Sequence, residues 1–441
     1  MKTAKSASEQ IREPAPGRIG RVRWTICALL FFATSINYLD RQVLGILAPV
    51  LQHDIGWTEQ QYSYIISAFQ IAYAIGLIVA GRMVDRVGTR IGYAVIMVIW
   101  SLAAMAHAFA RSALTFGIAR FFLGLSEAGN FPAAVKATAE WFPQKERSLA
   151  TGIFNSGTNV GAVLAPAIVP IITIKFGWPA AFLATGGIFG LIWIVWWLWR
   201  YRLPGEHKGV TRAEYDYIHS DAPTAAARIP WTHLLGFRQT WAFSIAKFLT
   251  DPIWWFYLYW LPKFFDSRFH LGLSELGLPL IVVYNFSAVG SIGGGWLPAF
   301  LNRRGVPMAK ARYLAMLIMA LLVLPIFFVG KLSTEWSVVA LLGLATAAHQ
   351  GWSANLFTTV SDMFPRQAVG AVVGIGGMAG SVGGVLFSLG VGYLLTLTHS
   401  YGLLFALSAS AYLIALFIFR LLVPRLTPVS VNITNAEQST Y

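Results

Sequence analysis

The stretch WTICALLFFATSINYLDRQVLGILA, at residues 24–48, decides the fold class of this chain. It is long enough to cross a bilayer as a helix, because spanning takes roughly 20 predominantly apolar residues. Two opposite charges, Asp40 and Arg41, nevertheless stand inside it. A charge in a membrane helix costs roughly 2.5–3.5 kcal/mol on insertion scales, so both are expected to have partners or to face a water-filled cavity. The stretch therefore predicts a membrane helix that carries a functional charged site.

The composition of the whole chain is that of a membrane protein with many spans. Of its 441 residues 56% are hydrophobic and only 12% are charged, against about 25% charged residues in soluble domains. Its apolar runs have helical length, whereas the strands of a barrel would be only about 9–11 residues long. We therefore predict an all-α membrane protein with twelve transmembrane helices. The predicted spans are residues 24–48, 62–81, 91–109, 114–142, 149–174, 180–199, 241–264, 276–301, 313–330, 336–360, 369–395 and 403–423.

The distribution of basic residues predicts the orientation in the membrane. The two tails and the even-numbered loops hold 24 of the 33 Lys and Arg residues. Lys and Arg concentrate in cytoplasmic loops, so both termini are expected in the cytoplasm. The net charge of +14 is then a topology signal, and we expect no nucleic-acid partner.

A polar segment divides the chain into two halves of six spans each. The predicted segments are an N-terminal cytoplasmic tail (1–23), a first six-helix bundle (24–199), a cytoplasmic linker (200–240), a second six-helix bundle (241–423) and a C-terminal cytoplasmic tail (424–441). Two parallel halves of this kind occur in one large class of secondary transporters.

The fourth span repeats the charged pattern of the first, with Arg120 and Glu127 in the segment RFFLGLSE. A spacing of seven residues puts both on one helix face, about 10 Å apart along the axis. Asp40 and Arg41 are adjacent and cannot share a face. One of them is therefore expected to line a central cavity while the other meets the fourth span.

Two intramembrane ion pairs are predicted from this arrangement, Asp40 with Arg120 and Glu127 with Arg41. Acids and arginines buried together in the membrane indicate a proton-coupled carrier of an anion. The alternative is that both pairs only hold the first bundle together, although buried ion pairs are weak evidence for such a stabilising role.

The loop between the second and third spans carries the most specific motif of the chain. Residues 81–90, GRMVDRVGTR, match the pattern G-x-x-x-D-R-x-G-x-[KR] at every specified position, which are Gly81, Asp85, Arg86, Gly88 and Arg90. In physical terms this is a tight turn, in which two glycines let helix ends approach and the acid caps a helix or pairs with a basic neighbour. The motif resembles that of the major facilitator superfamily, and it is expected to act in conformational change.

Within this superfamily, the segments NYLDR (37–41) and RFFLGLSEAG (120–129) resemble the first and fourth spans of the anion:cation symporter branch. Its members carry organic anions such as sugar acids, sialic acid, phosphate and glutamate. The chain is similar to bacterial hexuronate transporters of this branch, which take up glucuronate and galacturonate. The resemblance implies a multi-pass protein of the inner (cytoplasmic) membrane.

The resemblance also implies roles for six residues of the first half. Asp40 and Glu127 are expected to act in proton coupling. Substrate binding is expected from Arg41 as the carboxylate anchor, and from Arg120, Tyr38 and Tyr73.

Three further charged positions are less specific. Lys247 in the seventh span stands where relatives often have an arginine, and a lysine acts as a point charge rather than a fork. It is a candidate for substrate binding, but it could also extend to the membrane surface. Lys136 and Glu140 are four residues apart near the inner end of the fourth span and are expected to pair there.

The second half offers uncharged candidates for substrate binding. Trp254 and Trp255 are candidate walls for a sugar ring through the resemblance. His349, Gln350 and Asn355 in the tenth span could bind sugar hydroxyls. His349 could instead have its hydrogen bonds satisfied inside the bundle.

These observations predict a secondary transporter that carries a sugar-acid anion together with protons by alternating access. Moving one negative charge inward against the membrane potential costs roughly 2.3 kcal/mol per 100 mV, and a co-transported proton removes that cost. Alternatives are a symporter for an aldonate, glucarate or another organic anion, a phosphate-linked antiporter, and a membrane sensor with residues 200–240 as its output. We expect a monomer in the lipid bilayer, no enzyme activity, and neither a metal nor an organic cofactor, since the spans contain no metal-ligand cluster or activated nucleophile.

Overall fold

The computed structural model of the chain describes residues 19–220 and 231–429. Most of the two predicted tails and part of the predicted linker therefore lie outside the described residues. Within the described residues, each predicted span is a helix or a run of consecutive helices.

The helices of the first half follow the predicted spans in order. They are α1 (Val22–Ile55), α2 (Glu59–Val87), α3 (Thr89–Ala106) with a 3₁₀ turn (His107–Phe109), α4 (Ala113–Glu127), α5 (Asn130–Trp141), α6 (Gln144–Phe176), and α7 (Trp178–Phe182), which continues through a π-helical segment (Leu183–Phe189) into α8 (Gly190–Arg200).

The connecting segment and the second half are also helical. The connection holds a 3₁₀ turn (Pro204–Glu206), α9 (Arg212–Ile218) and α10 (Trp231–Leu234). The second half holds α11 (Arg238–Phe269), α12 (Leu273–Arg303), α13 (Met308–Val323) with a 3₁₀ segment (Leu324–Lys331), α14 (Glu335–Met363), α15 (Arg366–Thr398) and α16 (Gly402–Leu422).

Eight of these segments are long and apolar enough to cross a membrane by length and composition alone, and a ninth is α2, which bends by 45° between Leu77 and Val79. The remaining segments are α4 with α5, α11 and α14. These segments contain eight of the twelve residues predicted for proton coupling and substrate binding, and the other four, Tyr38, Asp40, Arg41 and Tyr73, lie on α1 and α2. The candidate site therefore draws on both kinds of span.

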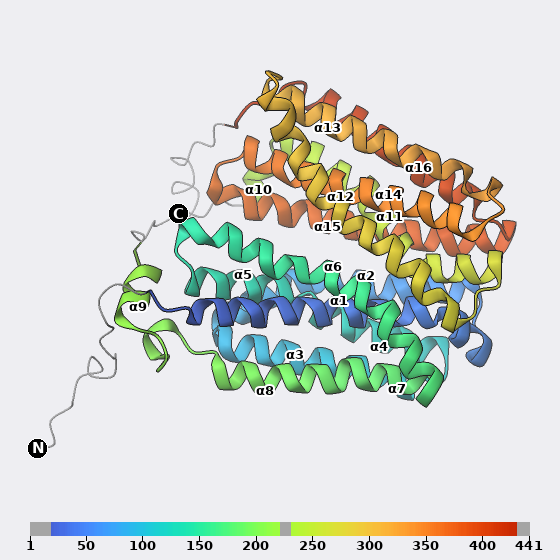
Figure 1. Ribbon diagram of the computed structural model, residues 1–441, viewed down its shortest axis with the longest axis horizontal. Helices are drawn as coiled ribbons and strands as arrows, with labels where there is room; N and C mark the ends of the chain where they lie inside the picture. Colours follow the sequence, from blue (N-terminus) through green and yellow to red (C-terminus); the bar gives the residue numbers. More distant parts are fainter. Residues whose placement is uncertain (1–18, 221–230, 430–441) are drawn as a thin grey trace, which may run out of the picture.

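The two halves form two layers of helices that run in a similar direction (Figure 1). Helices α1–α8 make up one layer and α11–α16 the other, and the start of α1 and the end of α16 lie at the same end of the molecule (Figure 1). Helix α9 also lies there and is held to α1, because the Arg23 guanidinium contacts the buried carboxylate of Glu214 at 3.3 Å. We call this end the terminal end, and the opposite end, where α1 stops and α2 starts, the α1–α2 end.

Glycines set the closest helix contacts inside the first half. A Cβ at Gly124 would lie 2.3 Å from the Phe69 carbonyl oxygen, so α4 can approach α2 only with glycine there. In the same way Gly161 lets α6 approach α1, since a Cβ would lie 2.3 Å from the Ser35 carbonyl oxygen. Small residues replace the hydrophobic driving force that membrane helices lack, by allowing close backbone packing.

The halves contact each other at the α1–α2 end. The Tyr62 hydroxyl donates to the Tyr259 carbonyl oxygen at 2.8 Å, and Lys263 forms an ion pair with Glu59. Gly45 lies against the Leu258 carbonyl oxygen, to which a Cβ would come within 2.6 Å. This end of the interface is therefore closed.

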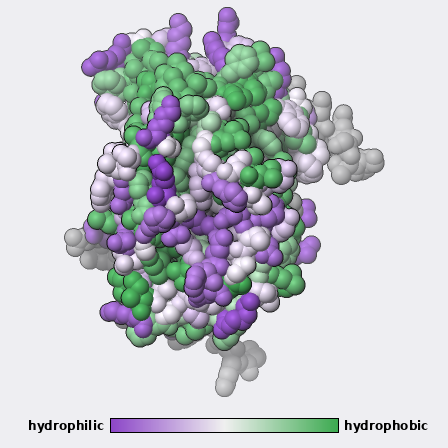
Figure 2. Space-filling model, turned by 90° about the vertical axis from the view of Figure 1, so that its right-hand side faces the viewer, coloured by the Kyte–Doolittle hydropathy of each residue, from purple (hydrophilic) through white to green (hydrophobic). Residues whose placement is uncertain are grey.

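Hydrophilic side chains gather at the α1–α2 end between hydrophobic regions, as Figure 2 shows. A cavity of about 440 Å³ opens here, and its lining includes Gln52, Glu59, Lys263 and Asp266. Toward the terminal end, in contrast, Thr151 and Asn155 are exposed one turn apart on α6. Polar side chains exposed along a membrane helix indicate access of water, so water can also reach α6 toward the terminal end.

The ion pair between Glu59 and Lys263 should act as a latch for the closed α1–α2 end. Glu59→Gln removes its charge and should shift the protein toward the state that is open at this end. We expect a thiol introduced by Ser63→Cys to react several-fold faster with a membrane-impermeant maleimide, because Ser63 is buried against Gly392 in the closed state.

Asp54→Asn is the matched control, because Asp54 is an exposed acid of the same connection and contacts only its neighbour His53 within the described residues. The chain without Ser63→Cys corrects for the buried Cys27. Equal labelling rates in the Glu59→Gln variant and the unaltered chain would contradict the latch.

Candidate functional site

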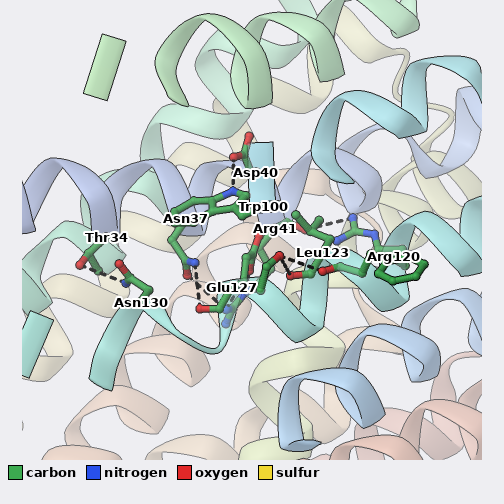
Figure 3. A network of polar contacts seen from close by, with 11 residues as sticks. Thr34, Asn37, Asp40, Arg41, Trp100, Arg120, Leu123, Glu127 and Asn130 are labelled. Carbon is green, nitrogen blue, oxygen red and sulfur yellow. Dashed lines mark hydrogen bonds and ion pairs between the residues drawn. The ribbon is translucent and has the colours of Figure 1, made fainter. Parts of the chain in front are cut away.

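Helix α1 directs Arg41 into the first half toward α4 (Figure 3). The Nε and Nη2 atoms of Arg41 donate to one oxygen, Oε2 of Glu127, at 3.1 and 3.0 Å. Asn37, one turn earlier on α1, accepts from Arg41 Nη2 at 3.2 Å. Both partners of the ion pair are almost fully buried, with 2% and 0% of their side chains exposed. The predicted Glu127–Arg41 ion pair is present.

A break in the fourth span fixes the Glu127 carboxylate. Glu127 is the last residue of α4, and α5 begins at Asn130 after a short turn. Asn37 Nδ2 donates to the Glu127 carbonyl oxygen at 3.5 Å, which partly satisfies an acceptor at the end of the helix. Beyond the break, Asn130 donates to Thr34 Oγ1 at 3.3 Å and accepts from the Tyr93 hydroxyl at 2.5 Å. The break is thus held on both sides by side-chain hydrogen bonds.

Asp40 points in another direction from Arg41. Its Oδ2 accepts from Trp100 Nε1 of α3 at 2.7 Å, and its Oδ1 has no hydrogen-bond partner among the described residues. The predicted Asp40–Arg120 ion pair is wrong. Successive residues on a helix are about 100° apart, so Asp40 faces α3 when Arg41 faces α4.

Arg120 is a fully buried cation without an acidic partner within ion-pair distance among the described residues. Its Nη2 donates to the Arg41 carbonyl oxygen at 3.3 Å, and its guanidinium lies 5.6 Å from the centre of the Phe69 ring and 5.8 Å from that of Tyr259. Its charge adds to that of Arg41, so the site has a positive field that suits an anion.

Aromatic rings from both halves surround the Arg41 guanidinium. The ring centres of Tyr38, Tyr73, Phe69 and Trp255 lie 4.7, 4.8, 5.2 and 5.2 Å from it. Rings at this distance attract a cation. Trp255 belongs to α11, so Arg41 lies where the halves meet, and the structure brings together four predicted substrate residues: Arg41, Tyr38, Tyr73 and Trp255.

The second half contributes a separate buried ion pair. Lys247 Nζ lies 2.6 Å from Asp251 Oδ2, one turn further along α11, and 4.5 Å from the centre of the Phe357 ring. Lys247 therefore does not extend to the membrane surface. Asp251 was not among the predicted site residues, although an acid four residues after an intramembrane lysine is a detectable signal.

The other candidates of the second half lie away from Arg41. Trp254 stacks on His349 at 5.3 Å between ring centres, and His349 Nδ1 lies 2.6 Å from the Tyr412 hydroxyl. Asn355 donates to the Gly294 carbonyl oxygen at 2.7 Å and so joins α14 to α12. His349 is thus satisfied inside the bundle, as the alternative interpretation has it, while Gln350 is half-buried on the same helix.

The motif at residues 81–90 forms the predicted turn with some differences. Gly88 has φ +85°, which favours glycine, and Asp85 pairs with Lys136 at 3.0 Å. Nothing lies within 4 Å of a Cβ placed on Gly81, so this glycine does not serve close packing. Arg86 is exposed.

Residues of the α2–α3 turn also provide partners for side chains in the C-terminal half of α5. Arg90 donates to the Leu198 carbonyl oxygen at 2.7 Å. Glu140 accepts from the Thr89 hydroxyl at 2.7 Å and from Tyr201. The predicted Lys136–Glu140 pair is therefore wrong, because the neighbouring turn provides a tertiary partner for each residue.

The fold consists of two layers of helices with buried charges at their interface. This arrangement is that of a secondary membrane transporter. Residues 30–388 match the model of the Major Facilitator Superfamily, and the chain belongs to this family. The predicted fold, twelve transmembrane helices in two six-helix bundles, is confirmed, and the protein is a transporter rather than an enzyme.

Two relatives and one solved structure illustrate the similarity. The chain is 34% identical over 383 residues to a hexuronate transporter of Escherichia coli (strain K12), which covers 86% of this chain and 88% of that protein. It is 33% identical over 329 residues to a galacturonate transporter of Dickeya chrysanthemi, covering 73% and 95%. The fold matches an inward-facing, occupied structure of a bacterial homologue of the human lysosomal transporter Spinster, with a TM-score of 0.72 at 15% identity, over 92% and 98% of the chains.

Asn37 should stabilise the site, since it contacts both the Arg41 side chain and the carbonyl at the break. Asn37→Ala leaves buried polar groups without partners, which costs about 1–3 kcal/mol. We expect a melting temperature several degrees lower in detergent. Asn285→Ala is the control, because Asn285 is exposed and donates only to a carbonyl of its own helix. Equal melting temperatures of both variants would show that Asn37 does not stabilise the break between α4 and α5.

Proposed function

We propose that this protein is a proton-coupled symporter that carries a hexuronate, such as glucuronate or galacturonate, into the cell by alternating access. The observation that carries the proposal is the buried Arg41–Glu127 ion pair at the interface of the halves, surrounded by aromatic rings. Arginine binds carboxylates through a planar fork, and aromatic faces suit a sugar ring. The names of the two relatives support a hexuronate as the substrate.

Coupling follows from competition for one guanidinium. While Glu127 is ionised, it occupies Arg41 and neutralises its charge. A proton on Glu127 weakens this pair, and Arg41 can then bind the substrate carboxylate instead. Substrate bound at Arg41 in turn favours the protonated acid, because the anion takes over the favourable interaction. The two ligands therefore load together, as linkage requires.

A second acid would make uptake sensitive to the membrane potential. One proton balances the charge of a monoanion, and a second one brings net positive charge inward, which gains roughly 2.3 kcal/mol per 100 mV. We propose that Asp40 carries this second proton. It is buried, it lies next to the Arg41 site, and one of its oxygens has no hydrogen-bond partner among the described residues.

The proposal includes the arrangement in the cell. We propose a monomer in the inner membrane with both termini cytoplasmic, and the division into tails, two bundles and a linker given by the sequence. In that orientation the α1–α2 end faces outward, and the contact between Tyr62 and Tyr259 closes the outer side. The interface of the halves would then open to the cytoplasm at the terminal end.

Competition for uptake tests the function. Proteoliposomes that contain the purified protein should accumulate labelled glucuronate when the outside is acidic, and not when the pH gradient is dissipated. Unlabelled galacturonate should compete, whereas glucose should not, because a neutral hexose offers no carboxylate to Arg41. Equal inhibition by glucose and glucuronate, or uptake that does not depend on the pH gradient, would refute the proposal.

Glu127→Gln separates proton coupling from binding. The amide mimics the protonated acid in size, so the variant should still bind glucuronate and exchange it across the membrane. It should fail to accumulate substrate under a pH gradient, since no proton is released from the site. Full accumulation would remove Glu127 from the proton path.

Folded yield in detergent accompanies this measurement. An ion pair that serves only stability would leave Arg41 buried and unpaired in the variant, and the yield would fall. Glu206→Gln is the control, because Glu206 is an exposed acid outside the spans. A low yield without any binding of glucuronate would support the structural interpretation of the pair.

A further inference from the structure

The Lys247–Asp251 ion pair on α11 is separate from the Arg41–Glu127 ion pair. Its atoms lie 2.6 Å apart, and 8% and 20% of the two side chains are exposed. A buried ion pair in a membrane helix is costly, and apolar residues in its place are often neutral or stabilising. The pair therefore calls for a functional reason.

The pair lies close to the Arg41 site along α11. Asp251 precedes Trp255 by four residues, so it lies about one turn, roughly 6 Å, along α11 from the ring that contacts the Arg41 guanidinium. A six-carbon acid with its carboxylate on Arg41 would extend toward this pair.

Helix α15 is shaped to accommodate the Asp251 carboxylate. A Cβ at Gly380 would lie 2.3 Å from Asp251 Oδ2, so any other residue at this position would displace the acid. Gly384, one turn along, would bring a Cβ within 3.2 Å of both Gln70 and Trp255. The two glycines let α15 pass close to the acid and to the Arg41 site.

The chemistry of the pair suits hydroxyl groups. A carboxylate accepts hydrogen bonds from hydroxyls and an ammonium group donates to them, so both together can bind neighbouring hydroxyls of a sugar. The net charge of the pair is zero, and it offers no free cation to an anion. A second carboxylate at this place would meet the like charge of Asp251, which is a repulsive element against the wrong ligand.

We propose that Asp251 is a specificity residue, which neutralises Lys247 so that the carrier accepts sugar acids with one carboxylate and rejects those with two, such as glucarate. This inference rests on the proposed function and narrows its substrate class. Arg41 takes the single carboxylate, and the Lys247–Asp251 pair binds hydroxyls at the other end of the substrate.

Charge variants in proteoliposomes test the inference. We compare two concentrations that each halve the uptake of labelled glucuronate, one of unlabelled glucarate and one of unlabelled glucuronate. The measurement is the ratio of the glucarate concentration to the glucuronate concentration. Asp251→Asn leaves Lys247 as an uncompensated cation of nearly unchanged size, and this ratio should fall at least tenfold. The double variant Asp251→Asn with Lys247→Gln is neutral again and should lose the gain.

Asp266→Asn is the matched control, because Asp266 is an acid of the same helix that lies at the α1–α2 end, about four turns from Asp251. It should leave the ratio unchanged. Lys247→Gln alone covers the case that Asp251→Asn does not fold. That variant keeps the acid and removes the cation, so it should not strengthen inhibition by glucarate.

The outcomes separate the inference from the function on which it rests. A wild-type protein that takes up glucuronate, with an Asp251→Asn ratio equal to that of wild type, would overturn the inference alone. Stronger inhibition by glucarate in Lys247→Gln, or in the double variant, would do the same. A wild-type protein that takes up no sugar acid would overturn both.

Discussion

The buried ion pair between Arg41 and Glu127 organises the first half of this protein, because a charge buried in the membrane is costly without an opposite charge beside it. The fourth span breaks directly after Glu127, and Asn37 contacts both the guanidinium and the carbonyl at the break. Glycines bring the neighbouring helices close enough for these contacts. The packing of the half thus serves to hold one carboxylate against one arginine.

The second half completes the site without a direct hydrogen bond to the pair. Trp255 contacts the Arg41 guanidinium, and the Lys247–Asp251 pair lies one turn away on the same helix. Contacts between the halves close the α1–α2 end, where Tyr62 and the Glu59–Lys263 pair cross the interface. The proposed recognition and the proposed gating therefore use different parts of α11.

The sequence predicts the twelve spans well, because the length of an apolar run is set by the thickness of the bilayer. It also predicts the Arg41–Glu127 pair, since an acid and an arginine lie well inside the first span and again well inside the fourth. It does not predict the partner of Asp40, because packing of α3 decides that Trp100 lies there. The spacing along the helix likewise predicts the wrong partner for Lys136, which pairs with Asp85 of a neighbouring turn. Tertiary contacts choose among partners that a linear pattern leaves equally possible.

The buried position of Arg41 among aromatic rings affects how many protons the carrier would use for each substrate molecule. A carrier with a proton on Glu127 and no substrate would bury a guanidinium without a counter-ion, and such a state costs several kcal/mol. The rings of Tyr38, Tyr73 and Trp255 already contact the guanidinium while it is paired with Glu127, so their attraction is no gain that replaces the lost carboxylate. In the proposed mechanism, the empty, protonated form is therefore too rare to cross readily between its two orientations. Slippage, in which protons leak inward without cargo, is suppressed by the same arginine that would hold the cargo.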